Sequence, residues 1–161
     1  GRRAGVAMRF TLRRAVAADA AAVRALVRDA YAKWVPVIGR EPKPMTANYN
    51  TAIRLNRVDL AHVEGELAGL IETIDRSDHL LIENVAVAPQ QHGQGLGRAL
   101  MAHAETVARA AGYRQVRLYT NRRFEANVQL YLRLGYSIDR EEEGPLGVTV
   151  YMSKSLPVAV V

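Results

Sequence analysis

The segment from residue 80 to residue 111 limits the possible folds of this chain more than any other. Leu80–Ala88 is an almost continuous apolar run that ends at Pro89, which predicts a strand buried on both faces. Residues 94–111 then place apolar side chains at helical spacing. Between strand and helix stand three glycines at alternate positions: Gly93, Gly95 and Gly97. A glycine-rich bend that opens a helix exposes unpaired N–H groups at the positive end of the helix dipole, so we predict an anion site suited to a diphosphate.

Two other glycine motifs fit this bend less well. The dinucleotide fingerprint G-x-G-x-x-G would need its last glycine where Arg98 or Leu100 stands, depending on whether it starts at Gly93 or Gly95. A P-loop needs a lysine followed by serine or threonine, and none follows these glycines. A strand-to-helix turn without any ligand is the remaining alternative.

The hydrophobic periodicity of the whole chain predicts one α/β domain with a mixed sheet. The expected strands are 9–14, 58–63, 67–74, 80–88, 114–120, 136–139 and 148–153, and the expected helices are 20–33, 46–56, 94–111 and 125–134. Lys33–Pro44 contains three prolines and a glycine and is predicted to be a loop. The acidic run Glu141–Glu143 is expected to separate the last two strands. We assign residues 8–155 to the domain, residues 1–7 to an N-terminal extension or cloning remnant, and residues 156–161 to a C-terminal tail.

Composition narrows the class of protein. No apolar run approaches the ~18 residues that a membrane span needs, and the absence of cysteine excludes disulfides, thiolate metal sites and a cysteine nucleophile. We therefore expect a cytoplasmic protein with no membrane partner and no metal site. The net charge of +6 favours an anionic partner, but the charge is spread along the chain without a basic tail, so a nucleic acid is not the predicted partner.

The bend and a second motif downstream resemble the GNAT superfamily of acetyltransferases. That superfamily carries Arg/Gln-x-x-Gly-x-Gly/Ala between a strand and a helix. The matching segment here is His92-Gly93-Gln94-Gly95-Leu96-Gly97, in which His92 replaces the usual Arg or Gln. The second motif, a helix with a Leu-Tyr pair that ends in Gly-Tyr, is matched by Asn127–Tyr136. The resemblance covers roughly residues 8–155 and implies a mixed, mostly antiparallel central sheet flanked by helices.

The resemblance implies acetyl-CoA as the acyl donor. Its pantetheine arm would lie between the strands 80–88 and 114–120, against the backbone of Val85, Ala86 and Val87. Its diphosphate would lie over the bend residues His92, Gly93, Gln94, Gly95, Leu96, Gly97 and Arg98. Asn127 and Tyr131 are also expected to touch it. Three arginines are candidates for the 3′-phosphate end, although ordinary solvated charge explains each equally well: Arg122, Arg123 and Arg133.

Acetyl transfer to an amine needs a base, an oxyanion donor and a proton for the departing thiolate. Glu83 is the candidate base, because it interrupts an otherwise apolar strand where a charge is costly unless it is paired or functional. The resemblance implies Tyr131 as the acid and the Val85 N–H as the oxyanion donor. Without cysteine, direct attack by the amine in a ternary complex is favoured over an acyl-enzyme. A pairing of Glu83 with an arginine and a purely packed Tyr131 are the alternatives.

The acceptor is expected to be a small-molecule or peptide amine. Candidate substrate-binding residues are Tyr31, Trp34, Ile38, Arg40, His79 and Glu83, and Met45 could add to this pocket. Trp34 could instead simply anchor its loop, and His79 could be a surface residue at a strand end. Glu72, on the neighbouring hairpin strand, is expected on a solvated face.

Three functions of different classes remain open from the sequence. The first is an N-acetyltransferase. The second is a non-catalytic acyl-CoA-binding regulatory module, which the presence of both Glu83 and Tyr131 disfavours. The third is a basic nucleic-acid-binding domain. The apolar tail Leu156–Val161 makes a homodimer possible.

Overall fold

A computed structural model describes residues 9–157 of the chain. Its centre is a seven-stranded sheet with the order β1-β2-β3-β4-β5-β7-β6. All neighbouring strands are antiparallel except β4 and β5, which are parallel. The strands are β1 (Thr11–Arg14), β2 (Arg57–Val63), β3 (Glu66–Asp75), β4 (Leu80–Val87), β5 (Gln115–Asn121), β6 (Ser137–Gly144) and β7 (Gly147–Ser155). The predicted fold class, a mixed and mostly antiparallel sheet flanked by helices, is therefore confirmed.

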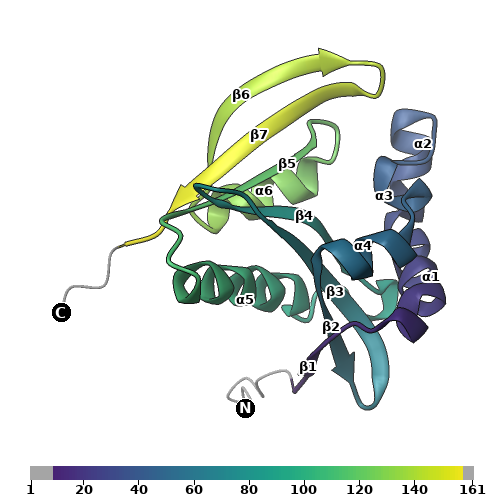
Figure 1. The fold of residues 1–161 in the computed structure, drawn as a ribbon. Helices are drawn as coiled ribbons and strands as arrows, with labels where there is room; N and C mark the ends of the chain where they lie inside the picture. The colour runs from purple at the N-terminus through teal and green to yellow at the C-terminus, as the bar shows by residue number, and fades with distance from the viewer. Residues whose placement is uncertain (1–8, 158–161) are drawn as a thin grey trace, which may run out of the picture.

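Helices cover both faces of the sheet (Figure 1). The α-helices are α1 (Ala20–Tyr31), α2 (Val35–Ile38), α3 (Lys43–Thr46), α4 (Tyr49–Leu55), α5 (Leu96–Ala110) and α6 (Glu125–Arg133). Neighbouring strand residues belong to different cores: Leu70 packs with α1 and α4, whereas Ile71 packs with α5 and α6. Because successive side chains of a strand point to opposite faces, the two cores lie on opposite sides of the sheet. Within residues 9–157, no helix has both the length and the apolarity to cross a bilayer.

The prediction that Lys33–Pro44 is a loop is wrong in detail, because this segment contains short helices. A 3₁₀ turn (Ala32–Trp34) leads into α2, and α3 follows after Pro42. Prolines lie in the first turn of both α2 and α3, where the missing N–H costs nothing. Arg28 of α1 fixes the segment: its guanidinium bonds the Glu41 carboxylate at 2.7 Å and the Met45 carbonyl at 3.0 Å. The segment is thus a fixed wall beside α1.

The prediction that an acidic run separates the last two strands is also wrong. Glu141–Glu143 lies inside β6 and pairs with β7. β6 is an edge strand and all eight of its residues are exposed, so carboxylates can occupy both of its faces. Charged side chains on an edge strand oppose pairing with other chains.

The ends of the chain bear on two sequence predictions. Residues 1–7, predicted as an extension, lie outside the described residues, as do residues 158–161 of the predicted tail. Leu156, the first tail residue, is buried in the core of its own chain, and its N–H donates to the Arg114 carbonyl at 2.8 Å.

β4 and β5 separate after a short region of contact. They pair only at Leu80, Leu81 and Ile82 of β4, although β4 continues to Val87. Beyond Ile82, β4 therefore has a neighbour on its β3 side only. This separation, in the middle of the sheet, opens the space in which the candidate site lies.

Gly69 of β3 lets helix α5 approach the sheet closely. A Cβ at this position would lie 3.0 Å from the Ala86 carbonyl oxygen, 3.1 Å from a Leu96 methyl and 3.2 Å from a Leu100 methyl. We expect Gly69→Ala to lower the free energy of unfolding by about 1–3 kcal/mol, because the start of α5 must shift. Thermal unfolding should show a Tm several degrees lower, whereas Gly144→Ala, whose added Cβ would lie 3.8 Å from the Gly147 carbonyl oxygen, should cost far less. An equal loss in both variants would contradict this close packing.

Candidate active site

The bend between β4 and α5 exposes backbone N–H groups. A 3₁₀ turn (Pro89–Gln91) follows β4, and Gly93 and Gly95 both adopt left-handed backbone angles, with φ of 76° and 85°. Helix α5 begins at Leu96, and the first of its N–H groups to find a helical partner is that of Ala99, which donates to Gly95 at 3.0 Å. The amides of residues 96–98 therefore have no partner within the helix and can bind an anion.

This bend forms one wall of a cavity of about 570 Å³, which we call the cradle cavity. The predicted bend residues that line it are His92, Gly93, Gly95, Leu96, Gly97 and Arg98; Gln94 is exposed and does not. Lys33 and Arg133 add positive charge from the helical segments opposite. No carboxylate of the described residues lines this cavity. The cradle cavity is thus basic and rich in free amides, as an anionic ligand requires.

The free edge of β4 borders the same cavity. The Ala88 N–H donates to the Ala68 carbonyl of β3 at 2.8 Å. Because backbone groups alternate along a strand, those of Ala86 also face β3, whereas those of Val85 and Val87 face the open side. Side chains contact both open carbonyls. The Tyr31 hydroxyl lies 3.3 Å from the Val85 carbonyl oxygen, and a His92 ring nitrogen lies 3.2 Å from the Val87 carbonyl oxygen. An extended ligand could pair with this edge in their place.

A second cavity, of about 420 Å³, lies where β4 and β5 separate. We call it the carboxylate cavity, because two carboxylates and five tyrosines line it: Glu72, Glu83, Tyr31, Tyr49, Tyr119, Tyr131 and Tyr151. Ile38 of α2 and Leu146 of the β6–β7 turn also contribute, so the helical wall and the terminal hairpin enclose it. Its charge is opposite to that of the cradle cavity.

Glu83 lies at an irregularity in β4. Ile82 pairs with Thr73 and Asn84 pairs with Glu72, so Glu83 is the extra residue of a β-bulge. Bulges redirect side chains and often lie beside active sites. Here the Glu83 side chain faces the carboxylate cavity, where the Tyr119 hydroxyl donates to its Oε1 at 2.7 Å. The alternative that an arginine pairs with Glu83 does not hold among the described residues.

Tyr131 lies where the two cavities meet. Four residues line both cavities: Tyr31, Val85, Asn127 and Tyr131. The Tyr131 ring is buried, and burial raises the pKa of its hydroxyl to about 12. Tyr131 therefore keeps its proton at neutral pH and can donate it at this junction.

The sequence of this chain matches a family of known proteins. The model of the acetyltransferase (GNAT) family matches residues 22–136, which is more than half of the chain. The chain belongs to the GNAT acetyltransferase family. The resemblance predicted from the bend and from Asn127–Tyr136 is thereby confirmed, and so is the cofactor at the level of the family, since GNAT enzymes use acetyl-CoA.

Individual GNAT proteins are similar over parts of the chain. N-alpha-acetyltransferase 80 of Mus musculus is 36% identical over 77 residues, which are 48% of this chain and 23% of that protein. Streptothricin acetyltransferase of Streptomyces lavendulae is 33% identical over 76 residues, 46% of this chain and 40% of that protein. The chain thus spans less than half the length of either relative. The PaiA N-acetyltransferase of Thermoplasma acidophilum, in complex with coenzyme A, has the same fold, with a TM-score of 0.79 over 92% of this chain and 99% of that one at 17% identity.

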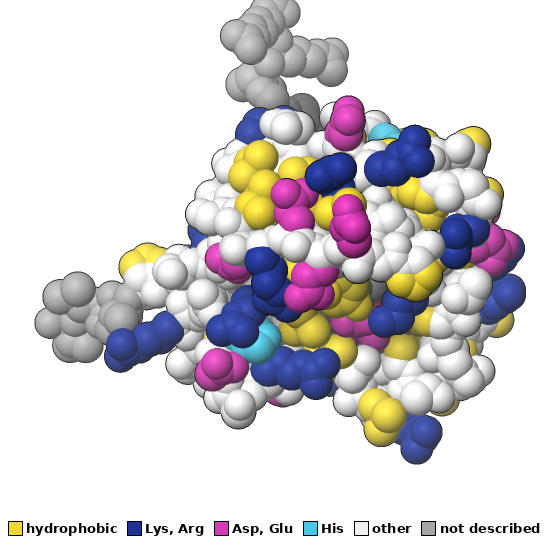
Figure 2. Space-filling view, turned by 90° about the horizontal axis from the view of Figure 1, so that it is seen from above, with side chains coloured by type: hydrophobic (Ala, Val, Ile, Leu, Met, Phe, Trp, Pro, Cys, Tyr) yellow, Lys and Arg dark blue, Asp and Glu magenta, His cyan; other side chains and the backbone are white. Residues whose placement is uncertain are grey.

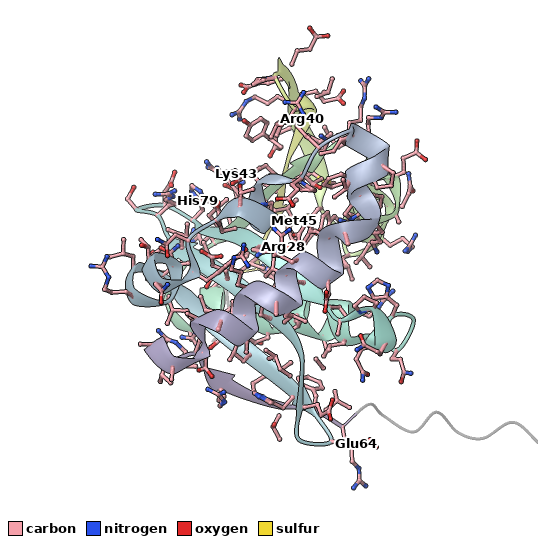
Figure 3. All side chains as sticks on the ribbon, turned by 90° about the vertical axis from the view of Figure 1, so that its right-hand side faces the viewer. Arg28, Arg40, Lys43, Met45, Glu64 and His79 are labelled. Atoms are coloured by element: carbon pink, nitrogen blue, oxygen red, sulfur yellow. The ribbon has the colours of Figure 1, made fainter. Side chains whose placement is uncertain are left out.

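Of the other predicted substrate-binding residues, two lie apart from both cavities and two line one cavity each. Arg40 is exposed beyond the end of α2, and His79 lies at the start of β4, where its Nδ1 is 2.7 Å from the Asp78 carboxylate (Figure 3). Neither lines a cavity. Trp34 lines the cradle cavity, and its ring stacks on Phe124 with centroids 4.6 Å apart. Ile38 lines the carboxylate cavity.

The three arginines that were candidates for the 3′-phosphate end do not lie together. Arg133 lines the cradle cavity, whereas Arg122 and Arg123 do not, and Arg122 lies 3.6 Å from the Glu141 carboxylate. Figure 2 shows that basic side chains on the face seen from above are dispersed among acidic ones rather than gathered in one patch. Among residues 9–157, no three His, Asp or Glu side chains are grouped so that they could hold a metal ion.

The prediction for Glu72 is wrong. This residue was expected on a solvated face, but it is only 5% exposed and lines the carboxylate cavity. Asn56 donates to its Oε2 at 2.8 Å, and burial, reinforced by the nearby charge of Glu83, raises the pKa of Glu72. The signal that identified Glu83, a single carboxylate within an apolar strand, was present in Leu67–Ile74 as well.

Proposed function

We propose that this protein is an N-acetyltransferase that moves an acetyl group from acetyl-CoA to an amine by direct attack in a ternary complex. The observation that carries the proposal is the meeting of two cavities of opposite charge at Tyr31, Val85, Asn127 and Tyr131. A basic cavity with free amides suits a polyphosphate, and an acidic, tyrosine-rich cavity suits a cationic amine. At the junction between the two cavities, the acetyl group would pass from coenzyme A to the amine.

The residues of the cradle cavity fit coenzyme A. The amides of residues 96–98, with Arg98 beside them, would hold the diphosphate, and Lys33 and Arg133 supply further positive charge. The backbone N–H groups of Val85 and Val87 face the open side of β4, and the pantetheine arm could pair there and replace the Tyr31 and His92 contacts to their carbonyls. When bound, acetyl-CoA supplies an activated acetyl thioester.

Two side chains perform the proton transfers, and one backbone N–H stabilises the negative charge that forms between them. Glu83 accepts a proton from the bound ammonium group, which leaves a neutral amine whose nitrogen bonds to the acetyl carbon; the second proton of that nitrogen passes to solvent as the adduct collapses. The Val85 N–H, on the open side of β4, stabilises the negative charge that develops on the acetyl oxygen. Tyr131 donates its proton to the sulfur as the C–S bond breaks, and solvent restores the protonation states. Because these groups line the cavities, an enzyme is favoured over a non-catalytic binding module.

The experiment that tests the proposal is a thiol-release assay with acetyl-CoA across a panel of primary amines. Transfer should appear as amine-dependent release of coenzyme A thiol. Tight binding of acetyl-CoA without release for any amine would instead support the regulatory module.

Tyr131→Phe is expected to lower kcat by roughly 10²-fold, because the thiolate loses its proton donor. The affinity for acetyl-CoA should change little, since the ring remains. Because the pKa of Tyr131 is raised to about 12, its protonated form persists as the pH rises, and the wild-type rate should show no alkaline decline from this group below about pH 11. Tyr113→Phe, which removes a hydroxyl outside both cavities, is the matched control. Equal rates for the two variants would exclude Tyr131 as the acid.

A further inference from the structure

Glu72 is a buried carboxylate that the proposed proton transfers do not use. Glu72 is 5% exposed, and within residues 9–157 a single hydrogen bond reaches its carboxylate, donated by the Asn56 amide to Oε2. No lysine or arginine among the described residues forms an ion pair with Glu72 or with Glu83. A buried carboxylate without a cationic partner is costly, so this arrangement is unfavourable for the free protein.

Glu72 and Glu83 face the same space from neighbouring strands. Glu72 pairs in register with Asn84, the residue that follows Glu83. Burial, and in addition the nearby charge of Glu83, raises the pKa of Glu72, as expected for two carboxylates with no cation between them. Among the residues that the structure describes, Lys43 is the only basic residue that lines the carboxylate cavity. It is exposed, with its ammonium 5.9 Å from the Tyr119 ring centroid. A cationic ligand would therefore supply the positive charge that the cavity lacks.

We infer that Glu72 is a specificity-determining residue, which selects acceptors that enter as compact cationic amines without a carboxylate beside the reacting nitrogen. This inference rests on the proposed function. The reacting nitrogen must come close to Glu83, so a group attached to the neighbouring carbon enters the field of both carboxylates. A carboxylate there is repelled, whereas a neutral amide or an alkyl group is accepted. The tyrosine rings of the cavity further favour a cation. Small amines and peptide-like amides therefore fit, and free α-amino acids do not.

The test uses two probes of the same shape, phenylalanine amide and phenylalanine, which differ in the charge beside the amine. Their affinities for the protein with coenzyme A present are measured by titration calorimetry, so the result does not depend on turnover. We expect the wild type to bind the amide at least about 50-fold more tightly. Glu72→Gln should narrow this ratio by about tenfold, because the variant keeps its shape and its bond to Asn56 but loses the charge. The test compares the ratio of the two affinities in Glu72→Gln with the same ratio in the wild type. The different basicities of the two amines affect both ratios equally and therefore cancel.

Glu66→Gln, an exposed position on the same strand, should leave the ratio as in the wild type. Equal affinity for the two probes, no binding of the amide, or an unchanged ratio in Glu72→Gln would overturn the inference. Thiol release is measured in parallel. Selective binding of the amide without any acetyl transfer would refute the proposed function alone, and equally fast transfer to phenylalanine would refute the selection by Glu72 alone.

Discussion

Glu83→Gln is expected to lower kcat by roughly 10²–10³-fold, while the Kd for acetyl-CoA stays within about twofold of the wild-type value. The glutamine side chain has the same shape and can still accept the hydrogen bond from Tyr119. It cannot accept the proton of the amine, so the loss should fall on the chemical step. Steady-state kinetics gives kcat, and calorimetry gives the affinity for acetyl-CoA.

The pH dependence separates a catalytic loss from a structural one. Loss of the catalytic base should change the shape of the pH–rate profile in Glu83→Gln, whereas a purely structural loss would lower the rate equally at every pH. Glu66→Gln, outside both cavities, should keep the wild-type profile. A Glu83→Gln variant with an unchanged pH–rate profile would exclude Glu83 as the base.

Gly95→Val is expected to weaken the binding of coenzyme A by roughly 10–100-fold. Gly95 has a φ of 85°, which a β-branched residue adopts only with strain of about 1–3 kcal/mol. The bend would relax by turning the amides of residues 96–98 away from a common point, so the anion would lose several donors at once. Calorimetric titration with coenzyme A measures the change.

A matched substitution distinguishes the geometry of the bend from general strain. Gly65 has a φ of 80° and, like Gly95, has no atom within 4 Å of an added Cβ, but it lies in the turn between β2 and β3. Gly65→Val should lose comparable stability in thermal unfolding and retain its affinity for coenzyme A. If both variants bound coenzyme A as the wild type does, the bend would not be the anion site.

The sequence predicted the bend well because every part of that prediction is local. A buried strand, a proline stop, glycines and a helical period follow one another within residues 80–111, and the structure has them in that order. The pairing order of the strands was not predicted, and the separation of β4 from β5 was implied only by the resemblance, which placed the pantetheine arm between these two strands. Such contacts join residues far apart in the chain, and no local pattern encodes them.

The acceptor side was predicted less well, for two physical reasons. Its wall was expected to be a loop, but Pro36 and Pro44 occupy helix starts, where proline is compatible with helix. Glu72 was expected in solvent, but its exposure depends on α4 and the terminal hairpin, which enclose the cavity from elsewhere in the chain. The close approach at Gly69 likewise depends on α5 and has no local signal.

The central claim is that the bend from Ala88 to Arg98 binds the diphosphate of coenzyme A on free backbone amides. A crystal structure of the complex with coenzyme A tests it most directly. The account predicts the diphosphate within hydrogen-bonding distance of the amides of residues 96–98, with the pantetheine arm along Val85 and Val87. Coenzyme A bound elsewhere on the chain, with this bend empty, would contradict it.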